Sequence, residues 1–357
     1  MEVVVHQQET AKRPRVEAAA AEVTGGTEMG VFEVLPQELT MSVLAAVSSR
    51  ADKPADLFNA MLACKMFRKL GKNPQVLKVA SLACLSVRFS KWCAAAELFL
   101  IRCGESGNAD ANYLLGMIQF YCLRERQRGW SRLMMAVRSG HAEATFAMAV
   151  IRLNGAGTAF ESRDLTAAAH LFALAANRGH NGALRDLAFC ISNGLGVPPN
   201  PSTGRSLTIC ANIKELLDRY PEGSELDGAL AHIRVGNNPD CCLFSNLGCF
   251  AAVSTYHEWP HPANRFMAEW FAAQPQAPAP APLQLMCSFP TCGRPETRPL
   301  EFRRCTMCGI GRYCSRMCQS LHWRMGHKQE CVPVYQWILA ANANAAANNN
   351  NNIGAPM

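Results

Sequence analysis

Residues 287–331 read CSFPTCGRPETRPLEFRRCTMCGIGRYCSRMCQSLHWRMGHKQEC. Thiolate sulfur and imidazole nitrogen are ligands that Zn²⁺ prefers, and a structural zinc ion takes four of them in a tetrahedron. The stretch therefore predicts a small domain over 285–331 that holds two structural zinc ions. The ligands come in four close pairs, which are Cys287 and Cys292, Cys305 and Cys308, Cys314 and Cys318, and His327 and Cys331.

The spacing within the pairs suits metal binding. Gly309 directly follows Cys305-Thr-Met-Cys308, and a glycine there lets backbone amides turn toward the sulfur atoms. Cys314 and Cys318 are four residues apart, and the last pair has the same spacing. Residues four apart share one face of a helix, so each of these pairs can point at a single ion.

The order of the pairs resembles the MYND zinc finger, over about 45 residues that end at Cys331. The resemblance implies binding of short, often proline-containing peptides in a shallow groove lined by Gln319 and Trp323. For Trp323, a place in the core between the two zinc lobes is the alternative. The resemblance also implies that the pairs interleave, with Cys287, Cys292, Cys314 and Cys318 on one ion and Cys305, Cys308, His327 and Cys331 on the other.

Two spacings depart from the MYND pattern. Four residues separate Cys287 from Cys292 where two are usual, and eight separate Cys318 from His327 where seven are common. The second departure leaves His322, one helical turn after Cys318, as an alternative ligand.

An internal repeat precedes the finger. The segments ESGNADA (105–111), RSGHAEA (138–144) and NRGHNGA (177–183) align, and the loops NGAGT (154–158) and NGLGV (193–197) lie 39 residues apart. These units resemble Sel-like repeats, relatives of the tetratricopeptide repeat, although the first has lost its Gly-x-Gly loop. We expect an α-solenoid over 90–273 whose residues 203–273 cap the exposed end. Repeat geometry explains the equivalent residues His141 and His180 better than metal binding does.

The first ordered segment, 31–85, resembles an F-box. The resemblance rests on the opening LPQEL (35–39), the apolar steps after it and the run CKMFRKL (64–70). It implies docking to the Skp adaptor of a cullin-based ubiquitin ligase, by a helix laid into a groove. The alternative is that these are the first helices of a larger helical domain. The adaptor-binding residues would be Leu35, Pro36, Leu39, Val43 and Leu44.

The remaining segments are flanks and a linker. We expect disordered tails over 1–30 and, rich in asparagine, over 340–357. Lys12-Arg13-Pro14-Arg15 is either a short nuclear-import signal or part of a solvated tail. Residues 274–284 are rich in proline and alanine, which predicts a semi-rigid spacer separating the helices from the finger.

Composition points to the nucleus or the cytoplasm. The chain has 357 residues, an odd count of 17 cysteines, no apolar run of membrane-spanning length and no apolar core for a signal peptide. The net charge of +7 is spread along the sequence. Thiolates and zinc ions together reduce the charge of the finger to roughly +2, which is weak steering for nucleic acid. We therefore expect neither a membrane nor a nucleic-acid partner.

The sequence favours an adaptor over an enzyme. Zinc sites with four protein ligands leave no place for an activated water. His257-Glu258-Trp259-Pro260-His261 has the spelling of zinc proteases, but Pro260 breaks the helix that such a site requires. A MYND lysine methyltransferase would need a catalytic domain split around the finger, and no such residues precede Cys287.

The chain as a whole is predicted to be mostly α-helical. The order of F-box-like helices, Sel-like repeats and a C-terminal MYND finger resembles a group of plant F-box proteins. That resemblance implies a non-catalytic substrate receptor of a Skp-cullin-type ubiquitin ligase, which recruits a protein target or a proline-containing peptide. The alternative is a nuclear corepressor-type scaffold with no ligase role, and copurification of a Skp adaptor separates the two.

Overall fold

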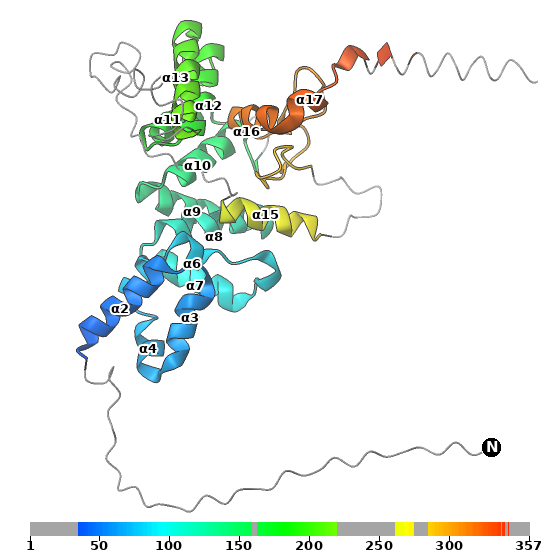
Figure 1. Ribbon diagram of the computed structural model, residues 1–357. Coiled ribbons are helices and arrows are strands. Elements are labelled where there is room, and N and C mark those ends of the chain that lie inside the picture. The colour runs from blue at the N-terminus through cyan, green and yellow to red at the C-terminus, as the bar shows by residue number, and fades with distance from the viewer. Residues whose placement is uncertain are drawn as a thin grey trace, which may run out of the picture.

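The computed structural model describes residues 35–158, 163–219, 261–274 and 285–336, together with 338, 339 and 342. The described chain is mostly helical, with helical repeats and a C-terminal finger, so the predicted fold class is confirmed (Figure 1). The predicted N-terminal tail, the predicted C-terminal tail apart from residue 342, the basic segment at 12–15 and the linker residues 275–284 lie outside the described ranges. None of the described helices combines the length and the apolar character that crossing a membrane requires.

Five short helices form the N-terminal part. Proline occupies the first turn of two of them, where its missing amide is harmless, and Cys64, Asn73 and Ser81 accept backbone N–H bonds at helix starts. Leu44, Leu57 and Leu85 have no exposed surface and form the centre of this part. The helices are α2 (Gln37–Arg50), α3 (Pro54–Ala63), α4 (Lys65–Leu70), α5 (Pro74–Lys78) and α6 (Leu82–Leu85).

Three helix pairs form the repeats, after the short 3-10 helix η1 (Phe89–Lys91). The turn within each pair contains a glycine with a φ of 86° to 90°, at Gly107, Gly140 and Gly179. The pairs are α7 (Ala94–Glu105) with α8 (Ala109–Met117), α9 (Arg126–Arg138) with α10 (Ala142–Asn154), and α11 (Leu165–Asn177) with α12 (Asn181–Asn193). The π-helical turn η2 (Ile118–Cys122) extends α8.

The residue after each turn glycine caps the second helix of its pair and reaches back to the preceding part of the chain. Asn108 caps α8 and donates from Nδ2 to the carbonyl oxygens of Lys78 at 3.0 Å and Ala80 at 2.9 Å. His141 caps α10, and its Nε2 lies 3.0 Å from Oδ1 of Asp110.

The third repeat continues this pattern. His180 caps α12, and its Nε2 lies 3.3 Å from Oε1 of Glu143. The pKa of Asp110 in the preceding contact is lowered, chiefly by the hydrogen bond from His141. The two histidines thus occupy equivalent places, in which each joins its helix pair to the preceding pair. We refer to these contacts of Asn108, His141 and His180 as the cap ladder.

The solenoid end differs from the prediction that 203–273 would cap it. Helix α13 (Pro201–Arg219) packs along α12 and does cover that end. Helix α15 (Pro262–Ala272) instead packs against α8, η1 and η2, near the first repeat (Figure 1). Its Phe266 is buried beside Trp92, with ring centroids 5.1 Å apart. His261 accepts from Ala263 N at 3.1 Å as the cap of α15, and residues 257–260 lie outside the described ranges.

The first repeat keeps one of the two left-handed backbone positions of the loop whose glycines it has lost. Arg124 lies 33 residues before Gly157 and adopts a φ of 60°, close to the 78° of that glycine. A left-handed conformation places Cβ against the backbone, which is costly for any residue except glycine.

We therefore expect Arg124→Gly to raise the free energy of unfolding by about 1 kcal/mol, because the steric cost it removes exceeds the entropy it adds to the unfolded chain. Urea denaturation measures the change. The matched control is Arg128→Gly, which falls within α9 and should lower stability by about 1 kcal/mol. A loss of stability in Arg124→Gly would contradict the account of this loop.

Candidate metal centre

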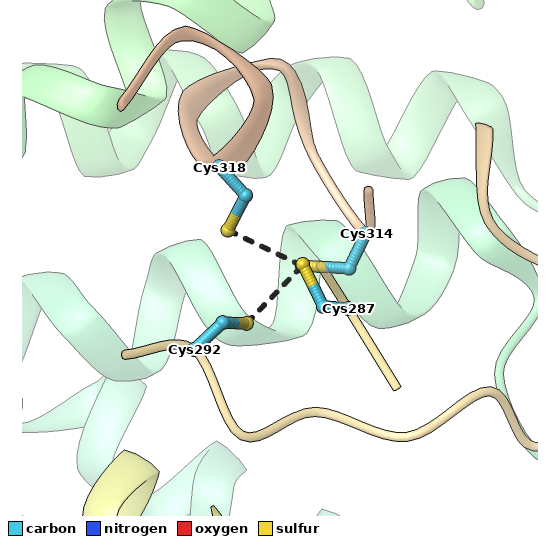
Figure 2. Close-up of side chains that lie close together, drawn as sticks. All are labelled: Cys287, Cys292, Cys314 and Cys318. Carbon is cyan, nitrogen blue, oxygen red and sulfur yellow. Dashed lines mark hydrogen bonds between the residues drawn. The ribbon is translucent and has the colours of Figure 1, made fainter. Parts of the chain in front are cut away.

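Four buried sulfur atoms lie together where the finger meets the repeats (Figure 2). The Sγ atom of Cys314 is 3.6 Å from those of Cys292 and Cys318. Cys287 completes this first group, in which all ligand atoms lie within 4.8 Å of one another. These are the four residues that the MYND resemblance assigned to one ion.

The other four predicted ligands form a second group. The Sγ atoms of Cys305 and Cys331 are 3.8 Å apart, and Cys308 Sγ is 3.6 Å from His327 Nε2. Again all ligand atoms lie within 4.8 Å of one another. The structure thus brings the eight residues together in two interleaved sets.

The donor atoms fit Zn²⁺. A tetrahedron with Zn–S bonds of 2.3 Å has sulfur atoms about 3.8 Å apart, and a disulfide would need a separation of about 2.05 Å. The observed separations of 3.6 and 3.8 Å match the tetrahedron. A bound zinc ion would supply the positive charge that lets buried thiolates sit side by side, with all four positions of each ion filled by protein.

Local backbone features bring the ligands into place. Strands β1 (Arg303–Arg304) and β2 (Arg312–Tyr313) pair antiparallel on either side of the knuckle, in which Gly309 has a φ of 68° and donates to Cys305 O at 2.8 Å. Helix α16 (Arg316–His322) begins at Ser315, whose hydroxyl accepts from Cys318 N at 3.1 Å.

The long gap between Cys318 and His327 has a physical explanation. Helix α16 continues into a π-helical turn, η4 (Trp323–His327), before α17 (Lys328–Glu330). The backbone of η4 leaves the helical conformation at Gly326 (φ 162°, ψ −30°), so this turn is a kink between α16 and α17, and the extra residue of the gap lies in the kinked segment. His322, the alternative ligand, lies outside both groups, and its Nδ1 is 3.0 Å from Tyr313 Oη.

The finger packs directly on the repeats. The carboxylate of Asp186 in α12 is 1 % exposed and accepts from the backbone N–H groups of Arg316 at 2.8 Å and Met317 at 3.1 Å, at the start of α16. Burial raises the pKa of Asp186 to about 6, although these two bonds act to lower it. Asn154 donates to Cys314 O at 2.8 Å. The expectation of a spacer that separates the finger from the helices was therefore wrong, because these polar contacts join them.

A buried arginine lies beside the first ligand group. Nη1 of Arg294 is 3.8 Å from the sulfur atoms of both Cys292 and Cys314. Although burial acts to lower the pKa of Arg294, these two sulfur atoms raise it well above its ordinary value. Four thiolates around Zn²⁺ carry a net charge of about −2, so Arg294 offsets part of it within the interface.

A groove of about 680 Å³ lies between the finger and helices α12 and α13. The two predicted peptide-binding residues, Gln319 and Trp323, line its finger side, and Arg185 and Phe189 line its helical side. Trp323 is half-buried, with its ring 5.9 Å from that of His327. Trp323 thus packs beside the predicted zinc-binding residue His327 and also lines the groove.

Sequence reasoning missed three residues that build this centre. Asp186 and Arg294 belong to no motif, and Asn154 opens the repeat loop NGAGT, in which nothing signals its contact with the finger. The repeat alignment gives Asp186 no special position, since Ala147 occupies the equivalent place one repeat earlier.

We expect metal analysis of the purified chain to find two zinc ions. Cys314→Ser and Cys305→Ser should each lose one ion and destabilise the finger, because a structural zinc contributes on the order of 10 kcal/mol to the folding of a small finger. Cys93→Ser changes an exposed cysteine outside both groups and should keep both ions. A wild-type chain that binds no zinc would contradict the assignment.

Asp186→Ala should lower the free energy of unfolding by about 2 kcal/mol, because it leaves two partly buried N–H groups without their acceptor. Asp164→Ala is the control. The side chain of Asp164 caps α11 by accepting one bond from Ala167 N, and no hydrogen bond joins it to the finger among the described residues. That change should cost about 1 kcal/mol. Equal losses in the two variants, measured by urea denaturation, would show that the finger contact adds nothing.

Comparison with known families supports both halves of the architecture. Residues 84–171 match the family model of plant tetratrico peptide repeats, and residues 287–331 match that of the MYND finger. Among solved structures, a Sel1 repeat protein from Oxalobacter formigenes is 19% identical with a TM-score of 0.36, covering 50% of this chain and 80% of that one. That likeness is too low to carry an argument about the repeats.

Matches among curated proteins range from a short stretch to most of the chain. Ubiquitin carboxyl-terminal hydrolase 15 of Arabidopsis thaliana is 61% identical over 31 residues, which is 9% of this chain and 3% of the hydrolase. F-box protein At5g50450 of Arabidopsis thaliana is 39% identical over 87% of this chain and 88% of its own length. F-box protein At1g67340 of the same plant is 39% identical over 87% of this chain and 83% of its own length. The chain therefore belongs to the family of plant F-box proteins, with tetratrico-type repeats and a C-terminal MYND finger.

Proposed function

We propose that this protein is a substrate receptor of a Skp-cullin-type ubiquitin ligase. The N-terminal helices would bind the Skp adaptor, while the repeats and the finger would bind the target protein. The observation that carries the proposal is an exposed apolar face of α2, formed by Leu39 and Val43, on the side of the helix away from the core residue Leu44.

The buried face of α2 is largely polar. Thr40, Leu44 and Ser48 point inward, each with no exposed surface. Leu39 is 54% exposed and Val43 is 45% exposed, although both are apolar. A helix that stands alone on a protein surface normally buries such residues and exposes the polar ones. The exposed face therefore favours a helix-in-groove contact with a partner.

The structure revises one of the predicted adaptor-binding residues. Leu44 belongs to the core of the N-terminal helices, so it supports the contact surface from behind and cannot touch a partner. Pro36 is exposed and Leu35 is partly exposed at the start of α2. The neighbouring helix α3 adds Leu62, which is 75% exposed.

The proposed adaptor face is firmly joined to the repeats. Asn108 ties the end of α5 to the start of α8, and one hydrophobic core runs from Leu44 to Met148. A rigid link of this kind would hold a target at a fixed place relative to the ligase. The groove lined by Gln319 and Trp323 is the proposed site for a proline-containing peptide of the target.

The setting of the cysteines supports a place in the nucleus or the cytoplasm. None of the cysteines in the described ranges is in a disulfide. Free thiols are typical of these reducing compartments.

The double variant Leu39→Ala, Val43→Ala should weaken adaptor binding roughly hundredfold, because it removes two apolar side chains that binding would bury. Calorimetric titration of the purified chain with a Skp adaptor measures the affinity. Leu98→Ala in α7 is the matched control, because Leu98 is also 45% exposed. Its affinity should equal that of the wild type.

Two results would contradict the receptor proposal. A double variant that is folded and binds as the wild type does would show that α2 is not the contact. A folded, zinc-loaded wild type that binds no adaptor would favour the corepressor-type scaffold.

A further inference from the structure

A second pocket lies between the start of α9 and the end of α10, on the middle repeat. Its volume is about 280 Å³, and it shares no lining residue with the groove at Gln319 and Trp323. The volume is at the low end for ligand sites, so that it suits one side chain better than a cofactor. The lining residues that matter here are Phe120, Arg126, Trp130, Ile151, Arg152 and Gly157.

The walls of this pocket are apolar. Phe120 and Ile151 are 3% and 4% exposed, and the half-buried Trp130 completes the lining. The guanidinium of Arg126 lies 5.2 Å from the ring of Phe120, and that of Arg152 lies 4.5 Å from the ring of Trp130. Two cations are thus held over the faces of two aromatic rings.

The positive charge of the pocket is not balanced by its own lining. No acidic side chain is among the lining residues that the structure describes. Nη1 of Arg126 is buried and has no hydrogen-bond partner among the described residues. A buried donor without a partner is costly, and a guanidinium pairs best with a carboxylate through two parallel bonds.

The pocket is already formed and is held by the finger. Thr297 accepts from Gly157 N at 2.7 Å, and Arg298 donates to the carbonyl oxygen of Asn154. A Cβ on Gly157 would lie 2.7 Å from Nη1 of Arg126. The loop glycine therefore makes the room that the guanidinium occupies.

We propose that this pocket binds the C-terminal residue of a partner protein. Arg126 pairs with the terminal carboxylate, Arg152 adds a second positive charge, and an apolar last side chain packs against Phe120, Trp130 and Ile151. The site goes beyond the proposed ligase role, to which it would add a class of target. Its test contains no adaptor, so failure of adaptor binding leaves it unaffected.

The test is calorimetric titration of the full zinc-loaded chain with N-acetylated tetrapeptides that end in leucine or phenylalanine. Each peptide is used as the free acid and as the C-terminal amide. The free acid should bind at least about tenfold more tightly, because the amide loses the charge-assisted pair with Arg126. This comparison uses the wild type alone and does not depend on the folding of a variant.

The matched variants are Arg126→Gln and Arg128→Gln, which lie on the same helix. Arg128 pairs with Glu125 on the surface and does not line the pocket. Arg126→Gln should weaken binding of the free acid about tenfold, and Arg128→Gln should leave it unchanged.

Four results would overturn the proposal, of which the last uses hexanoate. The first is that no free-acid peptide binds the wild type at millimolar concentration. The second is that the amide binds as tightly as the acid, and the third is that a folded Arg126→Gln variant binds the free acid as the wild type does. Hexanoate tests the source of the carboxylate. If it binds as tightly as the best peptide, the pocket recognises any apolar acid and the assignment to a protein C-terminus is wrong.

Discussion

Four cysteine sulfur atoms are buried at the interface between the finger and the repeats, and this places the strongest physical constraint on the molecule. Thiolates this close repel one another, so the group needs a cation at its centre and positive charge around it. A bound zinc ion would supply the cation, and Arg294 supplies part of the surrounding positive charge. Because Cys287, Cys292, Cys314 and Cys318 share one core with α10, α11 and α12, the metal site shapes the surface on which the finger docks.

A second constraint runs along the repeats. In the cap ladder, Asn108 contacts the end of α5, His141 contacts Asp110, and His180 contacts Glu143. Asp186 then joins α12 to the start of α16. These contacts form a series from the end of α5, in the N-terminal part, to the start of α16 in the finger. A receptor that positions a target for modification by a separate enzyme would gain from such a rigid connection.

The local features of the fold could be predicted from the sequence, because they depend on spacing. The eight ligands follow from four close pairs, and the repeats follow from glycines and small residues at fixed intervals. The docking of the finger could not be predicted, since Asp186 and Arg294 act through contacts between distant segments. The return of α15 to the first repeat is another long-range contact. The position of Leu44 was misjudged because α2 carries apolar residues on two faces, and only tertiary packing decides which of them is buried.

The central claim of this account is that the finger and the repeats form one cooperative unit held by metal. Hydrogen exchange with mass spectrometry, before and after zinc is removed by a chelator, tests it most directly. The account predicts that amides of α12, over residues 181–193, exchange at least about tenfold faster without metal, because loosening the finger removes the partners of Asp186. If the finger loses protection while α12 keeps its own unchanged, the two parts are independent and the claim is contradicted.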